Sequence, residues 1–389
     1  MKVVKGTMAL MISIVIMLSV PFNSRAAANY SSNTQSVMKA VWVSYIDLSM
    51  NTLDKSFSAF KNKFDKIVNN SKTRGFNTLI VQVRPFNDAL YKSKFFPVSH
   101  ILTGKQGAKI DYDPLEYMVK KIHQSGMSIH AWINPYRVRL NNQPKYLSGN
   151  NPYKKNKSIG VKWKNDVYLN PALKRTTNLI VKGVKEIVKN YDVDGVQFDD
   201  YFYPTTSAKF DKTQYTKYKN SVKNPKSLSK WRFSKINNMV KRVYNSIKEI
   251  NPRVQFGISP QGYYDNNKYL YADVKTWCEK KGYIDYICPQ LYWGIENKGS
   301  VTFDRAMIPW TKLKLHNGLK FYVGLAGYKA GSKKADKGAW RSKSNVLARE
   351  YRKALDKYNA NGVSVFRYEN TVSKRAKGEI NNLTKEFNK

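Results

Sequence analysis

Eight short apolar runs constrain the fold of this chain more than any other feature of its sequence. They span residues 40–46, 78–83, 128–133, 195–198, 254–258, 283–288, 320–325 and 363–366. Helical patterns lie between them, including residues 56–73, 114–125, 176–190, 229–250 and 344–361. Strand and helix patterns that alternate in this way predict an α/β fold, a (β/α)₈ TIM barrel.

A doubly wound parallel sheet is the alternative architecture. Such a sheet usually carries a glycine-rich phosphate loop after its first strand, and residues 45–48 (YIDL) contain no glycine. Asp113-Pro114 is typical of a helix start and Gly126 of a helix end. We also expect long loop insertions after strand three (residues 137–168) and strand four (residues 201–230), on the face where barrel enzymes bind ligands.

The N-terminus has the pattern of a secretory signal peptide. Lys2 and Lys5 precede an apolar run over residues 8–20, and small residues follow up to Ala28. A membrane anchor is the alternative, but the run is short for a span of about 20 residues. We therefore expect a signal peptide over residues 1–28, a polar leader over 29–38 and a single catalytic domain over 39–389. The expected location is outside the cell or in a bacterial wall.

The formal net charge is +41, from 68 Lys and Arg against 27 Asp and Glu. In an exported protein such a charge indicates an anionic neighbour, and bacterial walls supply teichoic acids and peptide carboxylates. Nucleic acid is the rival partner. Export and the even spread of the basic residues argue against it. A solvated basic surface without a specific ligand is the remaining interpretation.

Cysteine and histidine are too few for a disulfide-built or metal-built fold. The two cysteines, Cys278 and Cys288, leave a single bridge open. The four histidines have no paired metal-binding spacing, so we expect neither a metal nor a cofactor. No GxSxG sequence indicates acyl transfer, and no P-loop indicates a nucleotide.

Carboxylates follow two of the predicted strands. Strand four ends in DGVQFDDYFYP, which places Asp199 and Asp200 side by side, and Glu369 follows strand eight. Glycoside hydrolysis usually requires one carboxylic acid with a raised pKa and a second carboxylate as base or nucleophile. These three residues are the predicted catalytic candidates. As an alternative, one of the aspartates caps the next turn or pairs with Arg84.

Aromatic and amide side chains gather at the same strand ends. Rings that pack on sugar C–H faces, beside groups that bind hydroxyls, are typical of a glycan cleft. Taken singly, each ring could equally be a packing residue of the core. The predicted substrate-binding residues are Arg84, Trp132, Asn134, Tyr136, Tyr201, Gln290, Tyr292 and Trp293.

Six segments together resemble one family. They are AVWVSYIDL (from Ala40), GFNTLIVQVRPFNDALYKSKFFP (from Gly75), YDPLEYMVKKIHQSGMSIHAWINPYRV (from Tyr112), DGVQFDDYFYP (from Asp194), FGISPQG (from Phe256) and DYICPQLYWG (from Asp285). In order and spacing they are similar to the glycosyl hydrolase-like family 10, exported bacterial barrel proteins. The resemblance implies a glycosidase that cuts peptidoglycan strands from which the stem peptides have been removed. It places Arg84, Asn134, Asp199, Asp200, Gln290, Tyr292 and Trp293 in the cleft.

The sequence therefore predicts a secreted glycoside hydrolase for an N-acetylated wall glycan. An adjacent carboxylate pair resembles that of substrate-assisted N-acetylhexosaminidases. We assign the general acid to Asp200, while Asp199 orients the acetamido group or stabilises the positive charge on the sugar. Two alternatives come from other classes of protein. One is a non-catalytic glycan-binding protein on a barrel scaffold, and the other is a basic wall anchor held by teichoic acids.

Overall fold

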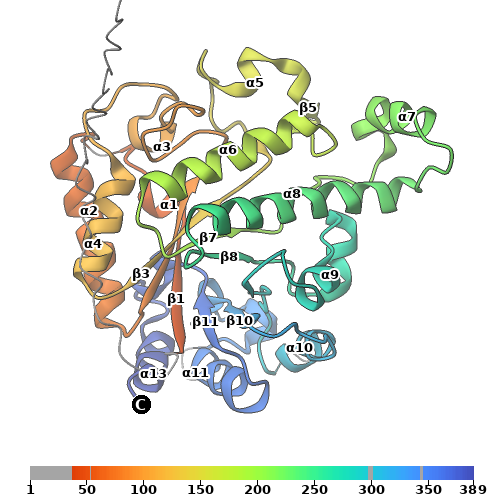
Figure 1. The fold of residues 1–389 in the computed structure, drawn as a ribbon. Coiled ribbons are helices and arrows are strands. Elements are labelled where there is room, and N and C mark those ends of the chain that lie inside the picture. Colours follow the sequence, from red (N-terminus) through yellow and green to blue (C-terminus); the bar gives the residue numbers. More distant parts are fainter. Residues whose placement is uncertain (1–36, 53, 297–300, 342–344) are drawn as a thin grey trace, which may run out of the picture. The chain divides into compact units, whose positions relative to one another are not determined.

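Eight parallel strands form a closed barrel in the computed structural model, which describes residues 37–52, 54–296, 301–341 and 345–389 (Figure 1). The strand order around the barrel is β1-β11-β10-β9-β8-β7-β3-β2. The strands are β1 (Met38–Val43), β2 (Thr78–Arg84), β3 (Ser128–Ile133), β7 (Gly195–Phe198), β8 (Gln255–Ile258), β9 (Tyr286–Ile287), β10 (Lys320–Leu325) and β11 (Gly362–Val365). Each predicted apolar run overlaps one of these strands, so the predicted barrel is confirmed.

The strands β1 and β9 differ most from the prediction. The first run was expected to reach residue 46, but β1 ends at Val43 and the chain turns into helix α1 (Tyr45–Leu48). The side chain of Asp47 accepts hydrogen bonds from the backbone N–H and the hydroxyl of Ser44, which stabilises this turn. Strand β9 is shorter than its run, although Gln290 still forms isolated bridges with Gln261 and Gly324.

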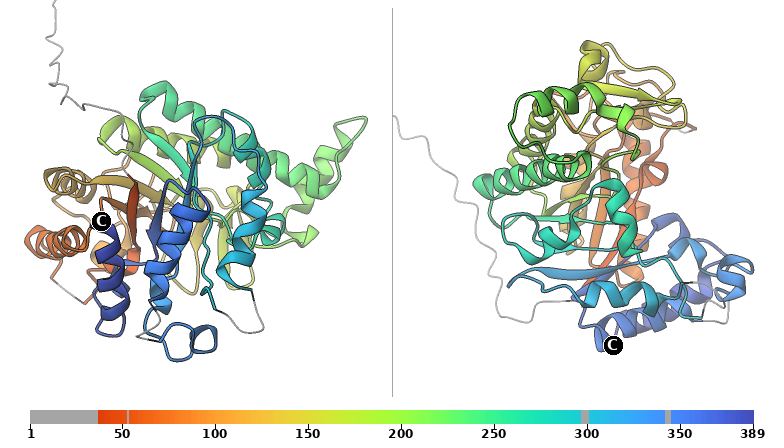
Figure 2. Two further views of the ribbon diagram at one scale, coloured as in Figure 1. Left: turned by 90° about the horizontal axis from the view of Figure 1, so that it is seen from below. Right: turned by 90° about the vertical axis from the view of Figure 1, so that its right-hand side faces the viewer.

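The longer helices lie outside the barrel (Figures 1 and 2). The α-helices that follow α1, long and short together, are α2 (Phe57–Thr73), α3 (His100–Thr103), α4 (Pro114–Gln124), α5 (Pro152–Lys155), α6 (Lys174–Asn190), α7 (Lys212–Asn220), α8 (Leu228–Ile250), α9 (Val274–Glu279), α10 (Phe303–Thr311), α11 (Val346–Arg352), α12 (Tyr368–Thr371) and α13 (Lys377–Phe387). Short 3₁₀ turns lie at Lys157–Ile159, Ala208–Asp211, Tyr264–Leu270, Gly327–Lys329 and Ala335–Gly338, and Lys353–Lys357 is π-helical.

Helix α4 begins and ends where the sequence marks it. The side chain of Asp113 accepts hydrogen bonds from the backbone N–H groups of Leu115 and Glu116, and Pro114 occupies the first helical position. Gly126 has a φ of +71°, a conformation in which most other residues are strained, and it follows the end of the helix. The predicted helix of residues 344–361 is shorter than expected, because α11 gives way to the π-helical turn; residue 344 lies outside the described residues.

Two apolar cores result from the alternation of side chains along the strands. Val41, Leu79 and Val81 pack outward in the large core beneath the helices. A smaller core combines Met38, Ala40, Trp42, Ile80, Trp132, Tyr286, Cys288 and Tyr322, which alternate with the outward residues and therefore fill the barrel. Both cysteines are buried and free.

The segments that follow β3 and β7 carry structure of their own. After β3, the strands β4 (Arg137–Arg139), β5 (Gly160–Trp163) and β6 (Asp166–Leu169) form a small antiparallel sheet in the order β4-β6-β5. After β7, helix α7 lies beyond the start of α8, away from the barrel strands (Figures 1 and 2). These segments supply residues at the carboxyl ends of the strands, where the candidate site lies.

Gly257 in β8 makes room for a ring inside the barrel. A Cβ atom at this position would lie 2.1 Å from the ring of Tyr286, which is fully buried. The Tyr286 hydroxyl is 2.9 Å from Nδ1 of His130 and 3.2 Å from the side-chain oxygen of Gln197, so the ring has little freedom to move. We expect Gly257→Ala to lower the free energy of unfolding by about 1–3 kcal/mol, measured by urea denaturation.

A matched control for this substitution is Gly149→Ala. A Cβ atom there would have no neighbour within 4 Å, and the φ of Gly149 is not positive. The control should change stability by less than about 0.5 kcal/mol. Equal stabilities for the two variants would show that Tyr286 can move aside.

The predicted signal peptide (residues 1–28) and most of the leader (29–36) lie outside the described residues. Met38, assigned to the leader by sequence, is the first residue of β1. Among the described helices, none combines the length and the apolar character that a membrane span requires.

Candidate active site

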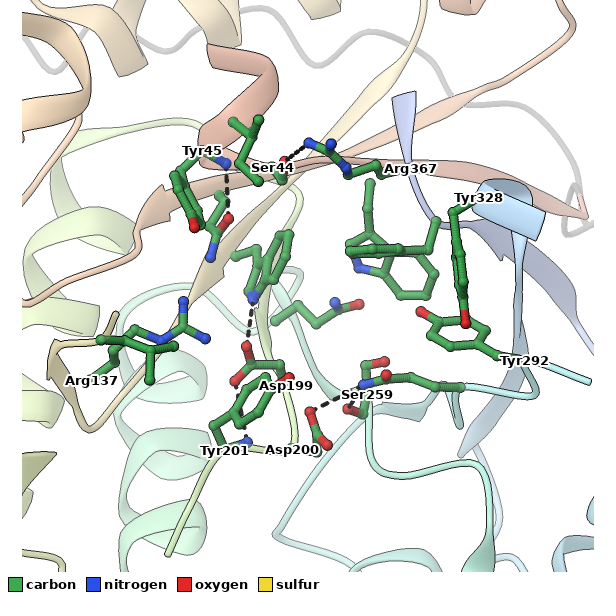
Figure 3. A pocket seen from close by; sticks show the side chains of 18 residues that line it. Ser44, Tyr45, Arg137, Asp199, Asp200, Tyr201, Ser259, Tyr292, Tyr328 and Arg367 are labelled. Atoms are coloured by element: carbon green, nitrogen blue, oxygen red, sulfur yellow. Dashed lines mark hydrogen bonds between the residues drawn. The ribbon is translucent and has the colours of Figure 1, made fainter. Parts of the chain in front are cut away.

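A pocket of about 400 Å³ opens at the carboxyl ends of the barrel strands (Figure 3). Parallel barrels place their binding sites at this end, because the loops that follow the strands converge there. The lining residues are Trp42, Ser44, Tyr45, Ile46, Gln82, Trp132, Arg137, Leu140, Gln197, Asp199, Asp200, Tyr201, Ser259, Gln290, Tyr292, Tyr328, Phe366 and Arg367.

Asp199 lies directly above the interior of the barrel. It follows Gln197 by two positions, so it continues the inward-facing side of β7, and it is 4% exposed. Its Oδ2 atom accepts hydrogen bonds from the Asn134 amide and, at 3.4 Å, from the Trp132 indole N–H. Its Oδ1 atom has only a long contact, at 3.5 Å, with the backbone N–H of Tyr201. Oδ1 can therefore accept a hydrogen bond from a ligand.

Burial raises the pKa of Asp199 to about 7. The positive charge of Arg137 acts in the opposite direction, and the neighbouring carboxyl of Asp200 raises the pKa further. A carboxyl group with a pKa near 7 changes its charge in the range where enzymes use general acids and bases.

Asp200 enters the same pocket because the chain turns after β7. Strict alternation would point it away from Asp199, but the ladder ends at Phe198 and the backbone N–H of Phe202 bonds to the Asp200 carbonyl at 3.0 Å. The side-chain amides of Gln261 and Gln290 donate to its two carboxyl oxygens, Gln290 at 3.2 Å. Burial raises the pKa of Asp200, while these two amides favour the ionised form.

An amide chain orients Asn134 towards Asp199. Gln82 of β2 donates a hydrogen bond from its side chain to the Asn134 carbonyl oxygen, and its own oxygen accepts from the backbone N–H of Tyr45 at 2.9 Å. Because the oxygen of Asn134 is engaged in this way, its N–H₂ group faces the carboxylate. The chain of hydrogen bonds thus connects α1, β2 and the residue that follows β3 to the candidate catalytic residue.

Aromatic rings form the floor and one wall of the pocket. Phe366 packs against Trp42 with ring centroids 6.0 Å apart, and against Tyr292 at 5.9 Å. Tyr328 meets Tyr292 edge to face at 5.7 Å. Tyr201 lies at the opposite side and is 53% exposed. Rings at these positions can pack on the C–H faces of sugars while the carboxylates reach the glycosidic bond.

The structure brings together six of the residues predicted from sequence and excludes four from the pocket. The predicted residues that line it are Asp199, Asp200, Trp132, Tyr201, Gln290 and Tyr292. Asn134 is not a lining residue, but its amide donates a hydrogen bond to Asp199. Arg84, Tyr136, Trp293 and Glu369 are not among the lining residues.

The expectation that Arg84 faces the cleft is corrected by a bulge in β2. The register with β3 shifts between Gln82 and Arg84, so Gln82 points inward and Arg84 points to the helices. The Arg84 guanidinium lies 4.5 Å from the ring of Phe96, and a Cβ atom at Gly183 in α6 would lie 2.2 Å from it. An ion pair with Asp200, the alternative drawn from the sequence, is therefore absent.

Glu369 is also displaced from the expected position. Helix α12 begins directly after β11, so the Glu369 side chain lies outside the barrel mouth, 59% exposed and paired with Arg367. Tyr136 is fully buried in the outer core, and Trp293 packs against Tyr263 with centroids 6.4 Å apart. The structure supports none of the site roles predicted for these three residues.

Several pocket residues were not predicted from the sequence. Gln82, which lines the pocket, and Gln261, which donates to Asp200, are polar residues at strand ends, the same signal that identified Gln290, and could have been included. Trp42 and Phe366 lie within or next to apolar runs, where nothing in one sequence separates a pocket floor from a core. Within the described residues, no group of His, Cys, Asp or Glu has an arrangement that could hold a metal ion.

Comparisons with known proteins identify the family of this chain. The model of the family "Glycosyl hydrolase-like 10" matches residues 37–342. Glycosyl hydrolase YngK of Bacillus subtilis (strain 168) is 34% identical over 352 residues, which are 84% of this chain and 67% of YngK. Glycosyl hydrolase DigH of Escherichia coli (strain K12) is 30% identical over 377 residues, which are 87% of this chain and 84% of DigH.

A solved structure shares the fold at low sequence identity. The glycoside hydrolase domain of PgaB (BpsB) from Bordetella bronchiseptica superposes with a TM-score of 0.59 at 9% identity, covering 87% of this chain and 97% of that domain. With the family match over most of its length, the chain belongs to the glycosyl hydrolase-like 10 family and is a TIM-barrel glycoside hydrolase.

Proposed function

We propose that this enzyme is secreted and cleaves an N-acetylated wall glycan, with peptidoglycan strands that have lost their stem peptides as the substrate. The observation that carries the proposal is the buried pair Asp199 and Asp200 at the mouth of an aromatic pocket, both with raised pKa values. Two carboxyl groups in such an environment have the acid and base properties that glycoside hydrolysis requires.

Asp200 is the general acid in this proposal. It donates its proton to the glycosidic oxygen as the bond to the anomeric carbon breaks. The carboxylate that remains accepts hydrogen bonds from Gln261 and Gln290, so the charge left by proton transfer is stabilised. In the second half of the reaction Asp200 takes a proton from the attacking water.

Asp199 orients the acetamido group of the substrate. Its Oδ1 atom accepts the acetamido N–H, while Oδ2 is held by Asn134 and Trp132. The acetamido carbonyl oxygen then attacks the anomeric carbon from the face opposite the leaving group, and water later opens the intermediate. This role requires the ionised carboxylate, which Arg137 favours.

The test of this function is the release of reducing ends from purified peptidoglycan, with the products identified by mass. We expect oligosaccharides without peptides from amidase-stripped polymer, and little release from intact polymer. The terminal sugar of the products identifies the bond that is cut. Absence of release from both polymers, together with tight pelleting onto walls, would contradict the proposal and favour a non-catalytic glycan-binding protein.

A basic arm offers a contact for anionic wall polymers. We define it as residues 209–230, which include α7 and the start of α8. Hydrogen bonds from the Tyr215 hydroxyl to the Lys226 carbonyl (2.9 Å) and from the Lys226 N–H to the Tyr218 hydroxyl (3.0 Å) hold it together. Its one acidic residue, Asp211, is buried against Arg232. Its exposed lysines are Lys209, Lys212, Lys217, Lys219, Lys223, Lys226 and Lys230.

Replacing four arm lysines by glutamine should weaken binding to walls that carry teichoic acid by about tenfold at low salt. The positions are Lys212, Lys217, Lys219 and Lys223, and the measurement is co-sedimentation with purified walls. The wild-type affinity should fall steeply up to an ionic strength of about 0.15 M, because exposed charges are screened.

The matched control removes the same formal charge from four other exposed lysines, Lys61, Lys120, Lys189 and Lys275. It should retain wild-type binding. If both variants lose affinity for the walls equally, binding depends on the net charge of the protein and not on the basic arm.

A further inference from the structure

Arg137 is a buried cation at the wall of the active-site pocket. It is the first residue of β4, is 8% exposed, and lines the pocket beside Asp199 and Asp200 (Figure 3). Its guanidinium carbon lies 5.2 Å from the ring centre of Tyr201 and 5.5 Å from that of Phe86. These rings support the guanidinium group by cation–π contact, which leaves its N–H groups available for other partners.

No described residue accepts a hydrogen bond from the Arg137 side chain or forms an ion pair with it. Arg367, the other arginine of the pocket, differs in this respect: it donates to Ser44 at 2.8 Å and pairs with Asp47 and Glu369. Arg232, also buried, pairs with Asp211 at 2.5 Å. A buried charge is costly without a partner. The partner of Arg137 is therefore to be sought in the ligand.

The carboxyl groups of Asp199 and Asp200 do not balance the charge of Arg137 as the carboxylate of an ion pair would. Both are close enough for its charge to lower their pKa values, but burial raises each pKa more strongly. Burial thus disfavours the two negative charges that would balance the guanidinium, which leaves room for the negative charge of a ligand beside Tyr201. A carboxylate on the substrate would complement this charge with two parallel hydrogen bonds.

We propose that Arg137 binds a carboxylate on the sugar and so selects glycans that contain acidic residues. The inference rests on the proposed function and names the group that is recognised: the lactyl carboxylate of the muramic acid residues. This group carries a charge only where no stem peptide is attached, because the peptide converts it into a neutral and bulky amide.

The experiment compares two forms of one oligosaccharide prepared from amidase-stripped peptidoglycan. In one form the lactyl carboxylates are free, and in the other they are converted to methylamides. Wild-type enzyme should favour the free acid in kcat/KM by about ten- to hundredfold, the range for hydrogen bonds between charged groups. Arg137→Met keeps the apolar stem of the side chain and should lose this preference, mainly through KM for the acid. Arg137→Lys should retain part of it.

Arg139→Met is the matched control. Arg139 lies on the same strand, donates to Asn142 at 3.3 Å and is not among the residues that line the pocket. Its substitution should leave the preference for the acid unchanged. Melting temperatures of all variants show whether each is folded.

Two outcomes would overturn the inference. Arg137→Met could lower kcat/KM equally for both forms and shift the pH profile, in which case Arg137 only adjusts the aspartates. It could also leave the preference for the acid intact. If wild-type enzyme cleaves neither form, the proposed function fails separately. The role of Arg137 is then decided by calorimetry, which measures the affinity of both oligosaccharide forms for Asp200→Asn and for the double variant Asp200→Asn/Arg137→Met. Equal affinities of the two forms for Asp200→Asn would refute the role of Arg137. A preference of Asp200→Asn for the acid that the double variant lacks would support it.

Discussion

Asp200→Asn is expected to lower kcat on the wall glycan by about 10²–10⁴-fold, the usual contribution of a general acid. The substitution preserves the size of the side chain and leaves one oxygen to accept from Gln261 or Gln290, but it removes the proton that the leaving oxygen requires. The affinity for the glycan should change little, because the group acts in the transition state. The measurements are reducing-end release for kcat and calorimetry for binding.

An aryl glycoside with a good leaving group separates this role from a structural one. Such a substrate departs without protonation, so Asp200→Asn should lose far less activity on it than on the glycan. Asp192→Asn serves as the control, since Asp192 is exposed and lies outside the pocket. If Asp200→Asn lost equal activity on the glycan and on the aryl glycoside, Asp200 would not be the general acid.

Asp199→Asn is expected to inactivate the enzyme on N-acetylated glycans and to stabilise the fold at high pH. The pKa of Asp199 is raised from 3.8 to about 7 in the folded state. Between these two values the unfolded chain has lost the proton that the folded chain still holds. The stability of the wild type therefore falls as the pH rises towards 7, and asparagine removes this loss. The variant should melt about 2–5 °C above wild type near pH 8, and at the same temperature near pH 4.

The difference in melting temperature between variant and wild type reports the carboxyl group of Asp199 together with its effect on the neighbouring carboxyl of Asp200, because all other titratable groups remain in both proteins. Scanning calorimetry at several pH values provides the measurement. A difference that is independent of pH would mean that Asp199 is ionised in the folded state throughout this range. Loss of activity together with a gain in stability is the behaviour of a catalytic group held in an unfavourable environment.

The barrel could be predicted because its strands are local patterns. The apolar residues of β1, β2 and β3 alternate or run continuously within a few positions, and helices such as α4 are marked by capping residues. The position of Asp199 followed in the same way, since it continues the inward side of β7. Adjacent carboxylates at a strand end are visible in the sequence without knowledge of any distant contact.

Side-chain direction at the strand ends could not be predicted as reliably. One bulge in β2 turns Arg84 away from the pocket, and a short helix directly after β11 carries Glu369 outside it. Regular alternation would have aimed Arg84, two positions after the inward-facing Gln82, at the ligand. A bulge depends on hydrogen bonds between strands, and the sequence of one strand does not contain that information.

The sequence by itself therefore determined the order of strands and helices and the end of the barrel at which the carboxylates lie. Only the tertiary structure decided which polar residues face one another. Asp200 shares the pocket with Asp199 because the chain turns after Phe198 and because Gln261 and Gln290, far away in sequence, donate to it. The raised pKa values and the unpaired charge of Arg137 have the same origin, because burial and pairing depend on all the segments that surround a group.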